Sequence, residues 1–220
     1  MKKLVAVLMV CVASCVFASA TGINAGDQMV SGTVGFGAGL QKSGWYFNGD
    51  KVDWGTVGAT FGLSYMIFPN EYLGVGVEIN DGIFAGEDDD YRSLGNHYEM
   101  ENSMNVLNLM ASFRANLNPK SSTRFYIPFG AGLTSATGTV DYTVNGWKKS
   151  KSASYNSLGW FVGVGFEKEI GQGNWALGAE ARYNAFSYDT DKLMKKFDGD
   201  GAGKKNYSYI SVAFKASYRF

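Results

Sequence analysis

The sequence predicts an all-β fold, an eight-stranded antiparallel up-and-down barrel. Composition is the first observation: the chain has 29 glycines among 220 residues, 15% aromatic residues and only three prolines. Periodicity is the second, because apolar and polar residues alternate with a period of two along most of the chain after residue 25, with turn residues between the segments. No helical period of useful length appears there.

The first twenty residues predict a secretory signal peptide. Lys2 and Lys3 give a basic start, an apolar stretch follows at residues 4–17, and Ala18-Ser19-Ala20 is a small-residue cleavage pattern. The apolar stretch is too short to span a bilayer. We therefore expect residues 1–20 to be removed after Ala20 and residues 21–220 to form one domain.

Both cysteines, Cys11 and Cys15, lie inside this leader, so the mature chain should contain neither a thiol nor a disulfide. A second interpretation stays open. Val12-Ala13-Ser14-Cys15 resembles the lipobox of bacterial lipoproteins, which would place a lipidated Cys15 at the mature N-terminus without changing the fold.

The first four predicted strands each place apolar residues on one face. In the first, Val34 and Phe36 alternate with Ser31, Thr33 and glycines, and the second stops at the turn signal Pro69-Asn70. The third and fourth repeat the pattern up to Asn118-Pro119. The predicted ranges are Met29–Leu40, Val57–Ile67, Tyr72–Asn80 and Leu107–Leu117.

The last four predicted strands continue the same alternation. A glycine-rich turn at residues 171–174 separates the seventh segment from the sixth, and the closing segment alternates strictly up to its terminal aromatic residue, Phe220. The predicted ranges are Phe125–Leu133, Leu158–Phe166, Trp175–Tyr183 and Lys205–Phe220.

The connections between these strands alternate in length. Short turns are expected near residues 69, 120 and 172, and long polar stretches at residues 42–53, 85–103, 143–155 and 189–205. An antiparallel meander with an even number of strands gives this asymmetry when both termini lie on the short-turn side.

The polar face indicates which side of the barrel is the interior. It carries mainly Gly, Ser, Thr and Asn with isolated charges of both signs, which suits the narrow lumen of an eight-stranded barrel that side chains just fill. A soluble barrel with its apolar face inside is the competing interpretation. The predicted lumen charges are Glu78, Arg114, Glu167, Glu180, Arg182, Lys215 and Arg219.

The apolar face carries aromatic residues near the short-turn ends of the strands. Such a ring is typical of a membrane interface, and roughly ten residues per strand suffice to cross a bilayer when tilted. Closure would also pair every backbone group, as lipid requires. The predicted girdle is Tyr65, Phe113, Phe125, Phe166 and Trp175, with Tyr218 and Phe220 at the end of the chain.

With its export signal and the terminal sequence "SYRF", the chain resembles the bacterial outer-membrane β-barrel family, and is most similar to small barrels such as the OmpA-type transmembrane domain and OmpX. The resemblance covers residues 21–220. It implies integral localisation in the outer membrane of a Gram-negative bacterium, with outer-membrane lipid and lipopolysaccharide around the barrel. It also implies that the barrel assembly machinery reads Tyr218 and Phe220. No peptidoglycan-binding domain follows the barrel, so a cell-wall tether is not expected.

We expect a filled, polar lumen and a role in envelope structure and surface-loop interactions rather than catalysis. Setting Trp175 opposite Phe220 places Glu180 opposite Lys215, and a buried charge needs such a partner. The rival function is a narrow channel or transporter for small solutes. A second rival is a lipid-modifying enzyme using His97, the only histidine.

Other ligand classes are not expected. Twenty basic residues balance twenty acidic ones, so nothing favours nucleic acid. The glycine patterns at residues 35–39 and 163–165 precede no helix, so no nucleotide cofactor is predicted. The acidic stretches at residues 87–90 and 198–201 lack the spacing of a calcium loop and are interpreted as solvated.

The long polar stretches differ in charge, which suggests a surface patch. The stretch at residues 85–103 is acidic, with Glu99 and Glu101 among its carboxylates, whereas the stretch at residues 143–155 holds Lys148, Lys149 and Lys151. We hypothesise that these loops associate electrostatically at the rim and form a surface recognition patch for a ligand.

Overall fold

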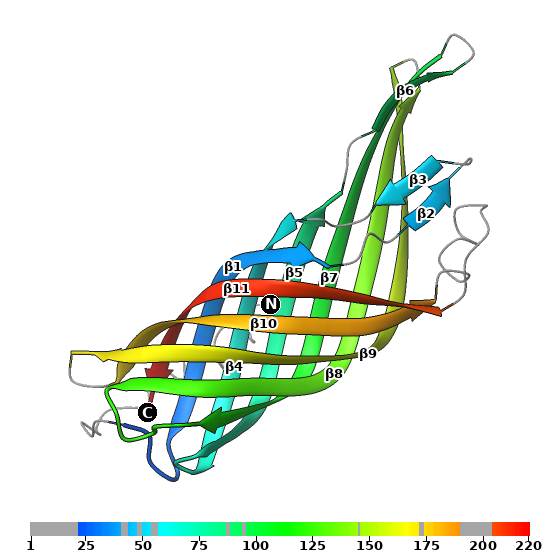
Figure 1. Ribbon diagram of the computed structural model, residues 1–220. Helices are drawn as coiled ribbons and strands as arrows, with labels where there is room; N and C mark the ends of the chain where they lie inside the picture. The colour runs from blue at the N-terminus through cyan, green and yellow to red at the C-terminus, as the bar shows by residue number, and fades with distance from the viewer. Residues whose placement is uncertain are drawn as a thin grey trace, which may run out of the picture.

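The computed structural model describes residues 22–40, 44–47, 50–53, 57–86, 89–93, 96–144, 146–171, 174–189 and 204–220. Eight long strands form a closed wall, as the alternation predicts (Figure 1). The wall strands are β1 (Gln28–Gly39), β4 (Val57–Asn70), β5 (Leu73–Ala85), β7 (Asn96–Asn116), β8 (Thr123–Val144), β9 (Trp147–Ile170), β10 (Trp175–Asp189) and β11 (Lys204–Arg219).

Every wall strand pairs antiparallel with its neighbours in the chain, and the pairing of β1 with β11 closes the ring. The two ends of the wall meet at one point, where the amide of Gln28 donates to the carbonyl of Phe220 and the amide of Phe220 donates back, each at 3.0 Å. Closure pairs both edges of each strand within the ring, whereas residues 147–158 of β9 extend beyond it and pair with β8 alone, since β10 pairs only with Gly159–Ile170.

Three short connections lie at the end of the barrel where the chain also ends, as predicted; we call this the short-turn end. They join β4 to β5, β7 to β8 and β9 to β10. The opposite, long-loop end carries three further strands outside the wall: β2 (Gly44–Phe47) and β3 (Asp50–Asp53) form a hairpin, and β6 (Asp89–Ser93) pairs with the first residues of β7.

The predicted long loop at residues 143–155 is wrong, because β8 continues to Val144 and β9 begins at Trp147. The stretch at residues 85–103 is likewise largely β6 and β7. Both were interpreted as loops since they are polar, yet they alternate: Ala153 is buried while Ser152 and Ser154 are exposed. A polar outer face is what a strand needs where its outer surface contacts water.

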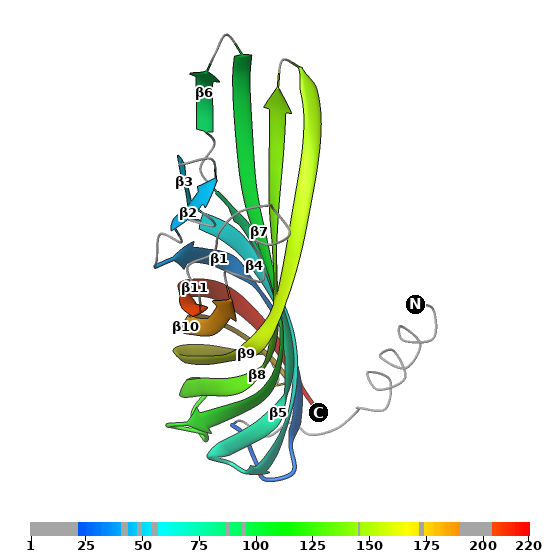
Figure 2. The ribbon, with the colours of Figure 1, turned by 90° about the vertical axis from the view of Figure 1, so that its right-hand side faces the viewer.

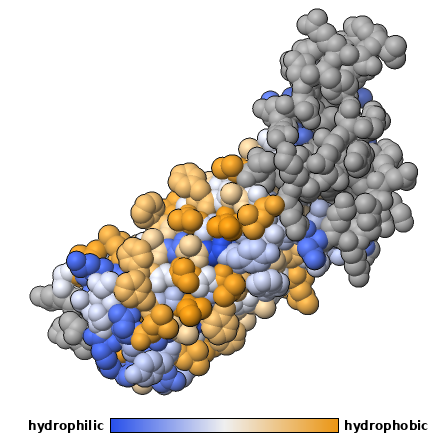
Figure 3. Space-filling model, in the orientation of Figure 1, coloured by the Kyte–Doolittle hydropathy of each residue, from blue (hydrophilic) through white to orange (hydrophobic). Residues whose placement is uncertain are grey.

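Strands β7, β8 and β9 therefore project well beyond the rest of the wall, and we call the projecting ribbon (residues 96–106, 135–144 and 147–157) the extension (Figure 2). Outward apolar side chains surround the middle of the remaining wall and predominate on the visible face there, whereas hydrophilic residues gather at the short-turn end (Figure 3). We call this middle part the apolar band.

The register of the last hairpin differs from the predicted one by two residues. Trp175 lies opposite Tyr218 rather than Phe220, and Lys215 lies opposite Gly178. Phe220 comes after the last residue of β11 and bonds to Gln28, so it does not belong to the ladder from which the register was counted.

Candidate functional site in the charged lumen

All seven charged residues predicted to line the lumen lie inside the barrel. Their side chains come from five different strands, β5, β7, β9, β10 and β11, because every second residue of each strand points inward. Six of the residues are buried, and the side chain of Arg182 is 10% exposed. They are Glu78, Arg114, Glu167, Glu180, Arg182, Lys215 and Arg219.

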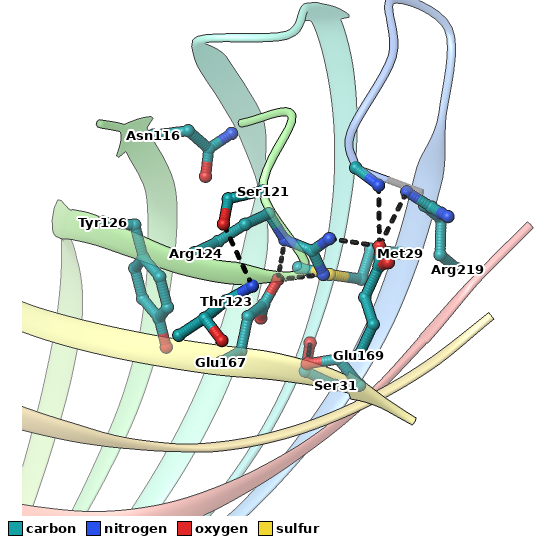
Figure 4. Close-up of polar contacts among 12 residues, drawn as sticks. Met29, Ser31, Asn116, Ser121, Thr123, Arg124, Tyr126, Glu167, Glu169 and Arg219 are labelled. Carbon is teal, nitrogen blue, oxygen red and sulfur yellow. Dashed lines mark hydrogen bonds and ion pairs between the residues drawn. The ribbon is translucent and has the colours of Figure 1, made fainter. Parts of the chain in front are cut away.

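The lower network, nearest the short-turn end, consists of Arg114, Arg124, Glu167, Glu169 and Arg219. Arg114 binds Glu167 with two parallel hydrogen bonds of 2.7 and 2.8 Å, and Arg124 Nη2 lies 2.9 Å from the same carboxylate. Arg124 also contacts Glu169, which Arg219 approaches from the other side at 3.4 Å (Figure 4). Bidentate pairing of this kind fixes both position and orientation.

The middle network consists of Glu78, Glu180, Arg182 and Lys215. Arg182 joins the two carboxylates, donating to Glu78 Oε2 at 2.9 Å and contacting Glu180. Lys215 Nζ lies 3.6 Å from Glu180 Oε2. The expected contact between Glu180 and Lys215 is therefore present although they are not directly opposite, because long side chains reach a diagonal neighbour.

Tyr126 connects the two networks. Its ring lies beneath the Arg114 guanidinium, with 3.8 Å between the guanidinium carbon and the ring centroid, and its hydroxyl donates to Glu180 Oε2 at 3.0 Å. Lys215 Nζ is 5.0 Å from the same ring. One buried aromatic side chain thus contacts charges above and below it.

An apolar layer lies beyond these networks, on the side of the long-loop end. Phe84 is its centre, with ring centroids 5.0 Å from Tyr209 and 6.4 Å from Tyr207. Tyr209 also accepts a hydrogen bond of 3.3 Å from Asn108, which links this layer to the polar lumen. We call it the aromatic cluster: Phe84, Met104, Val106, Ala136, Ala153, Phe186, Tyr188, Tyr207 and Tyr209.

The lumen between these layers is nearly full. A cavity of about 20 Å³ lies beside Glu180, Arg182 and Tyr209, which is room for about one water molecule. At the short-turn end Ile23, a residue before β1, is completely buried in a small apolar cluster. Among the described residues, packed side chains thus occupy the interior from the short-turn end to the aromatic cluster.

Sequence reasoning missed several lumen residues. Arg124 and Tyr126 are buried, as is the Glu169 side chain, but the fifth strand was taken to begin at Phe125 and only its outward residues were considered. Extending the alternation of β8 and β9 by one inward residue would have found Arg124 and Glu169. The aromatic cluster was missed because the lumen was expected to be polar throughout.

The predicted girdle aromatics lie on the outer face and meet in cross-strand pairs. Trp175 and Tyr218 are directly opposite with ring centroids 4.9 Å apart, and Phe125 and Phe166 are opposite at 6.3 Å. Tyr65 donates to Gln28 at 2.6 Å. Phe113 stacks on Phe129 at 5.4 Å, and Phe220 lies 6.2 Å from Tyr218.

One carboxylate interrupts the outer apolar band. Asp81 alternates with Ile79 and Ile83, lies opposite Leu107, and accepts a hydrogen bond of 2.6 Å from Asn105. Leu107 is the last outward apolar residue of β7 before the extension. Asp81 therefore lies close to the level at which the surroundings of the barrel change.

The charges of the extension form local pairs. Lys148 Nζ lies 3.4 Å from Asp141 on the neighbouring strand and 3.7 Å from Glu101 on the next strand. Hydrogen bonding to Ser150, and then Lys148, lowers the pKa of Asp141, and Asp141 in turn raises the pKa of Lys148. Opposite charges do meet here, but between strands rather than between loops.

The residues considered for the rival enzyme function lie on β6 and β7. His97 pairs with Arg92 and Ser93 with Asn96, so positions 93 and 97 belong to opposite faces of the β6–β7 ribbon. Ser103 lies six residues further along the same strand. The side chains at residues 87–100 and the stretch 198–201 lie outside what the structure describes, as do Cys15 and Ala20.

Within the described residues, no group of three or more histidine, cysteine or acidic side chains is arranged to hold a metal ion. In the same part of the chain, no helix is long and apolar enough to cross a membrane.

Comparison with solved structures finds barrels of similar fold. Ail of Yersinia pestis, in complex with the heparin analogue sucrose octasulfate, is 16% identical, with 89% of this chain and 99% of Ail covered and a TM-score of 0.49. OprG of Pseudomonas aeruginosa is 15% identical (93% and 99% covered, TM-score 0.47). The protease OmpT of Escherichia coli is 10% identical (94% and 99%, TM-score 0.48).

Among curated proteins, none matches this chain. The family comparison is decisive, because the model of the outer membrane protein beta-barrel domain matches residues 5–220, nearly the whole chain. The chain belongs to the outer membrane protein β-barrel family and is an integral protein of the outer membrane.

Proposed function

We propose that this protein is a closed, non-conducting barrel that anchors an extramembrane β-ribbon in the outer membrane and presents it for surface contacts. The observation that carries the proposal is the filling of the lumen by two charge networks, a bridging tyrosine and an aromatic cluster. A solute would have to displace paired, buried charges at two levels.

A conducting pore needs a continuous polar path with weak, exchangeable binding sites. Here the lower network leaves no such path, since Arg114 and Glu167 are completely buried and satisfy one another. The aromatic cluster then separates the polar lumen from the long-loop end. The protein therefore contributes a rigid wall to the envelope and no route for solutes through its centre.

The extension supplies the surface for contacts. Trp147 is 79% exposed near the tip, next to exposed Lys148 and Lys149, and the face of β9 that carries Lys148 continues with exposed Ser150 and Ser152. An exposed indole beside ammonium groups suits an anionic partner with a flat apolar face, such as an acidic carbohydrate.

The proposal also assigns roles to the outward aromatic residues and to the last strand. The outward aromatics at the short-turn end anchor the barrel at the inner lipid interface. Tyr218 and Phe220 are the residues that the assembly machinery recognises, and lipid and lipopolysaccharide contact the apolar band. Replacing Phe220 with Ser should lower the amount of folded protein in the membrane, while the same change at the exposed extension residue Trp147 should not.

Conductance of the refolded protein in a planar bilayer tests the closed lumen. We expect no steady open level from the unaltered protein. A variant with four changes, Arg114→Ser, Tyr126→Ser, Arg182→Ser and Phe84→Ser, serves as the positive control, because it removes large side chains at both network levels and at the centre of the aromatic cluster. Heat-modifiable gel migration reports whether each protein has folded. A large, steady conductance from the folded unaltered protein would show that the lumen is a channel.

Catalysis by His97 is a separate question with its own assay. The proposal gives His97 no chemical role, so His97→Ala should leave the lipid composition of vesicles containing the protein unchanged relative to the unaltered protein. Lipase or deacylase turnover that falls by orders of magnitude in the variant would establish the enzyme function instead.

A further inference from the structure

A groove crosses the outer face of the barrel within the apolar band. It has a volume of about 710 Å³ and is lined mainly by apolar side chains. The strands that carry most of it are β5, β4, β1, β11 and β10, which are consecutive in the ring (Figure 1). We call it the outer groove and define it by Gly32, Phe61, Leu63, Leu177, Phe214 and Ala216.

Two small residues between longer ones produce the depression. Gly32 lies directly opposite Ala216, and the next residues in the same row are Leu63 on one side and Leu177 on the other. Both leucines point outward and are 57% and 52% exposed. A Cβ atom at Gly32 would meet a methyl carbon of Leu63 at 3.8 Å and no other atom within 4 Å, so the space above the glycine is open.

The outer groove runs obliquely down the barrel. At its β5 end lies Asp81, the ninth residue of that strand from the short turn, whereas Leu177 at its β10 end is only the third residue of its strand. A difference of six residues corresponds to about 20 Å along a strand, or about 15 Å of depth for strands tilted by about 40°. That depth is half of a hydrocarbon core of about 30 Å. Because the long loops of such barrels face the cell exterior, the groove passes through the outer leaflet.

Hydrocarbon is the material that must occupy this groove, because the barrel is an integral membrane protein and these side chains face the lipid. An unfilled depression would forfeit dispersion contacts. An acyl chain that lies in the groove contacts protein on two sides, whereas a chain on the convex wall contacts it on one. The groove volume also falls within the range of about 300–1,000 Å³ that is usual for small-molecule sites. The outer groove therefore favours one ordered acyl chain.

Asp81 gives the upper end of the groove a chemical preference. One of its carboxylate oxygens accepts the hydrogen bond from Asn105, and the residue alternates with the outward residues Ile79 and Ile83. The carboxylate would repel a lipid phosphate at this place, whereas an N–H or O–H group would donate to it. A charge on the lipid face costs free energy, so a donor supplied by the lipid would also stabilise Asp81. The lipid that fits carries such a donor where its acyl chain begins.

We propose that the outer groove binds an outer-leaflet lipid of the acylated amino-sugar class, with one acyl chain in the groove and an amide or hydroxyl group of its head donating to Asp81. The end of the chain then lies beside Leu177. The proposal rests on the lipid contacts that the proposed function assigns to the apolar band, and not on the closed lumen.

Photocrosslinking in vesicles tests the site. Two probes carry the same acyl chain with a diazirine at its end: an N-acylated glucosamine lipid, which has N–H and O–H donors, and phosphatidylcholine, which has none. Each probe is added as a small fraction to phosphatidylcholine vesicles that contain the refolded protein, and the adducts are mapped by mass analysis.

The reference position is Phe125, the third residue of β8, which points outward at the same distance from the short turns as Leu177. The glucosamine lipid should label Leu177 about fivefold more than Phe125, the gain expected from one hydrogen bond, whereas the ratio for phosphatidylcholine should stay below about twofold. Equal labelling of the two positions by the glucosamine lipid would overturn the proposal.

Filling the groove should remove the preference. Gly32→Leu/Ala216→Leu occupies the depression with two apolar side chains, so the glucosamine lipid should then label Leu177 and Phe125 alike. Ala111 and Ala131 provide the matched control, because they also lie directly opposite one another and are exposed on the outer face. Ala111→Leu/Ala131→Leu should leave the ratio unchanged. Heat-modifiable gel migration reports the folding of both variants, and an unchanged ratio in the folded, filled variant would contradict the site.

Substitutions at Asp81 test the head group. Asp81→Leu removes the acceptor and should lower the ratio for the glucosamine lipid to that for phosphatidylcholine, while Asp81→Asn keeps an acceptor oxygen and should retain part of the preference. The same ratio for both lipids in the unaltered protein would overturn the assigned lipid class. Adducts that join two protein copies through the groove would assign it to a second copy instead. A conducting lumen would contradict the proposed function without altering these ratios.

Discussion

Strand β7 passes through two surroundings, and its residues are arranged oppositely in each. Between Leu107 and Leu117 the outward side chains are apolar and the inward ones include Asn108, Ser112 and Arg114, whereas in the extension Ser103 and Asn105 point outward and Met104 and Val106 are buried. Inward and outward residues alternate in both parts, but the apolar residues point outward in the first part and inward in the second. Lipid surrounds the first part and water the second, and the side chains follow the solvent.

The level at which the apolar residues change from the outer to the inner face is visible in the sequence. Two consecutive apolar residues, one outward and one buried, occur on three strands at the level where the apolar band ends: Val106-Leu107, Ile83-Phe84 and Tyr209-Ile210. In each of these pairs the outward residue belongs to the apolar band and the buried one to the aromatic cluster.

The largest effect is expected from a substitution in the charge networks inside the membrane-embedded part. Arg114→Met leaves Glu167 with fewer partners in a buried site and should lower the free energy of unfolding by about 4 kcal/mol. The double variant Arg114→Met/Glu167→Gln should recover half or more of the loss. Urea unfolding in lipid vesicles measures both, and a double variant as unstable as the single one would mean that the charges are not coupled.

The next effect tests the outer surface of the same strand. Leu109→Arg places a charge on the apolar band and should cost about 3 kcal/mol of folding free energy, because lipid cannot solvate it. Ser103→Arg, also outward on β7 but in the extension, is the matched control and should change stability by less than about 0.5 kcal/mol. Equal costs would contradict the assignment of lipid to one region and water to the other.

A smaller effect tests the interior of the extension. Val106→Ala removes buried methyl groups from the aromatic cluster and should cost about 2 kcal/mol. The adjacent Leu107→Ala shortens an outward side chain that is 42% exposed, so it should cost less than about 1 kcal/mol in a bilayer. The same unfolding assay measures both variants. A larger loss of stability in Leu107→Ala than in Val106→Ala would mean that the apolar face does not change sides at this level.

The smallest effect concerns pH and the tip of the extension. Because Ser150 and Lys148 lower the pKa of Asp141 from 3.8, its contribution is present above about pH 3.8 and is lost as the pH falls through the lower folded value. Protease resistance of the tip should fall slightly below that pH. Asp141→Asn should abolish this pH dependence, and high salt should weaken it.

Most of the wall could be predicted, because one rule, inward polar and outward apolar, holds for residues such as Glu78, Glu167 and Lys215 in most of the embedded part, although Met110 and Phe161 are inward apolar exceptions. The extension could not, since its Ser, Thr and Lys residues were assigned to loops by polarity alone. The sequence predicted the contact between Glu180 and Lys215, although the register used for this prediction was wrong by two residues. Alternation fixes the face of a residue, but hydrogen bonding at Phe220 decides the register.

The burial of Ile23 and the bridging role of Tyr126 could not be predicted for a different reason. Ile23 gives no periodic signal, and its burial depends on Pro119 and Phe68, which are distant in sequence. Tyr126 required knowing that Arg114 and Glu180 approach it from two other strands. Such contacts follow from closure of the ring and cannot be deduced from any one segment.

Strands β8 and β9 run unbroken from the short turns to the tip, over 22 and 24 residues. Their backbone hydrogen bonds lie across the direction of the strands. A pull on the exposed tip, directed away from the cell, therefore loads many of these bonds together in shear instead of opening them singly. A partner bound at the tip is therefore mechanically connected to the whole barrel, because β8 and β9 join the point of attachment to the membrane anchor without a hinge.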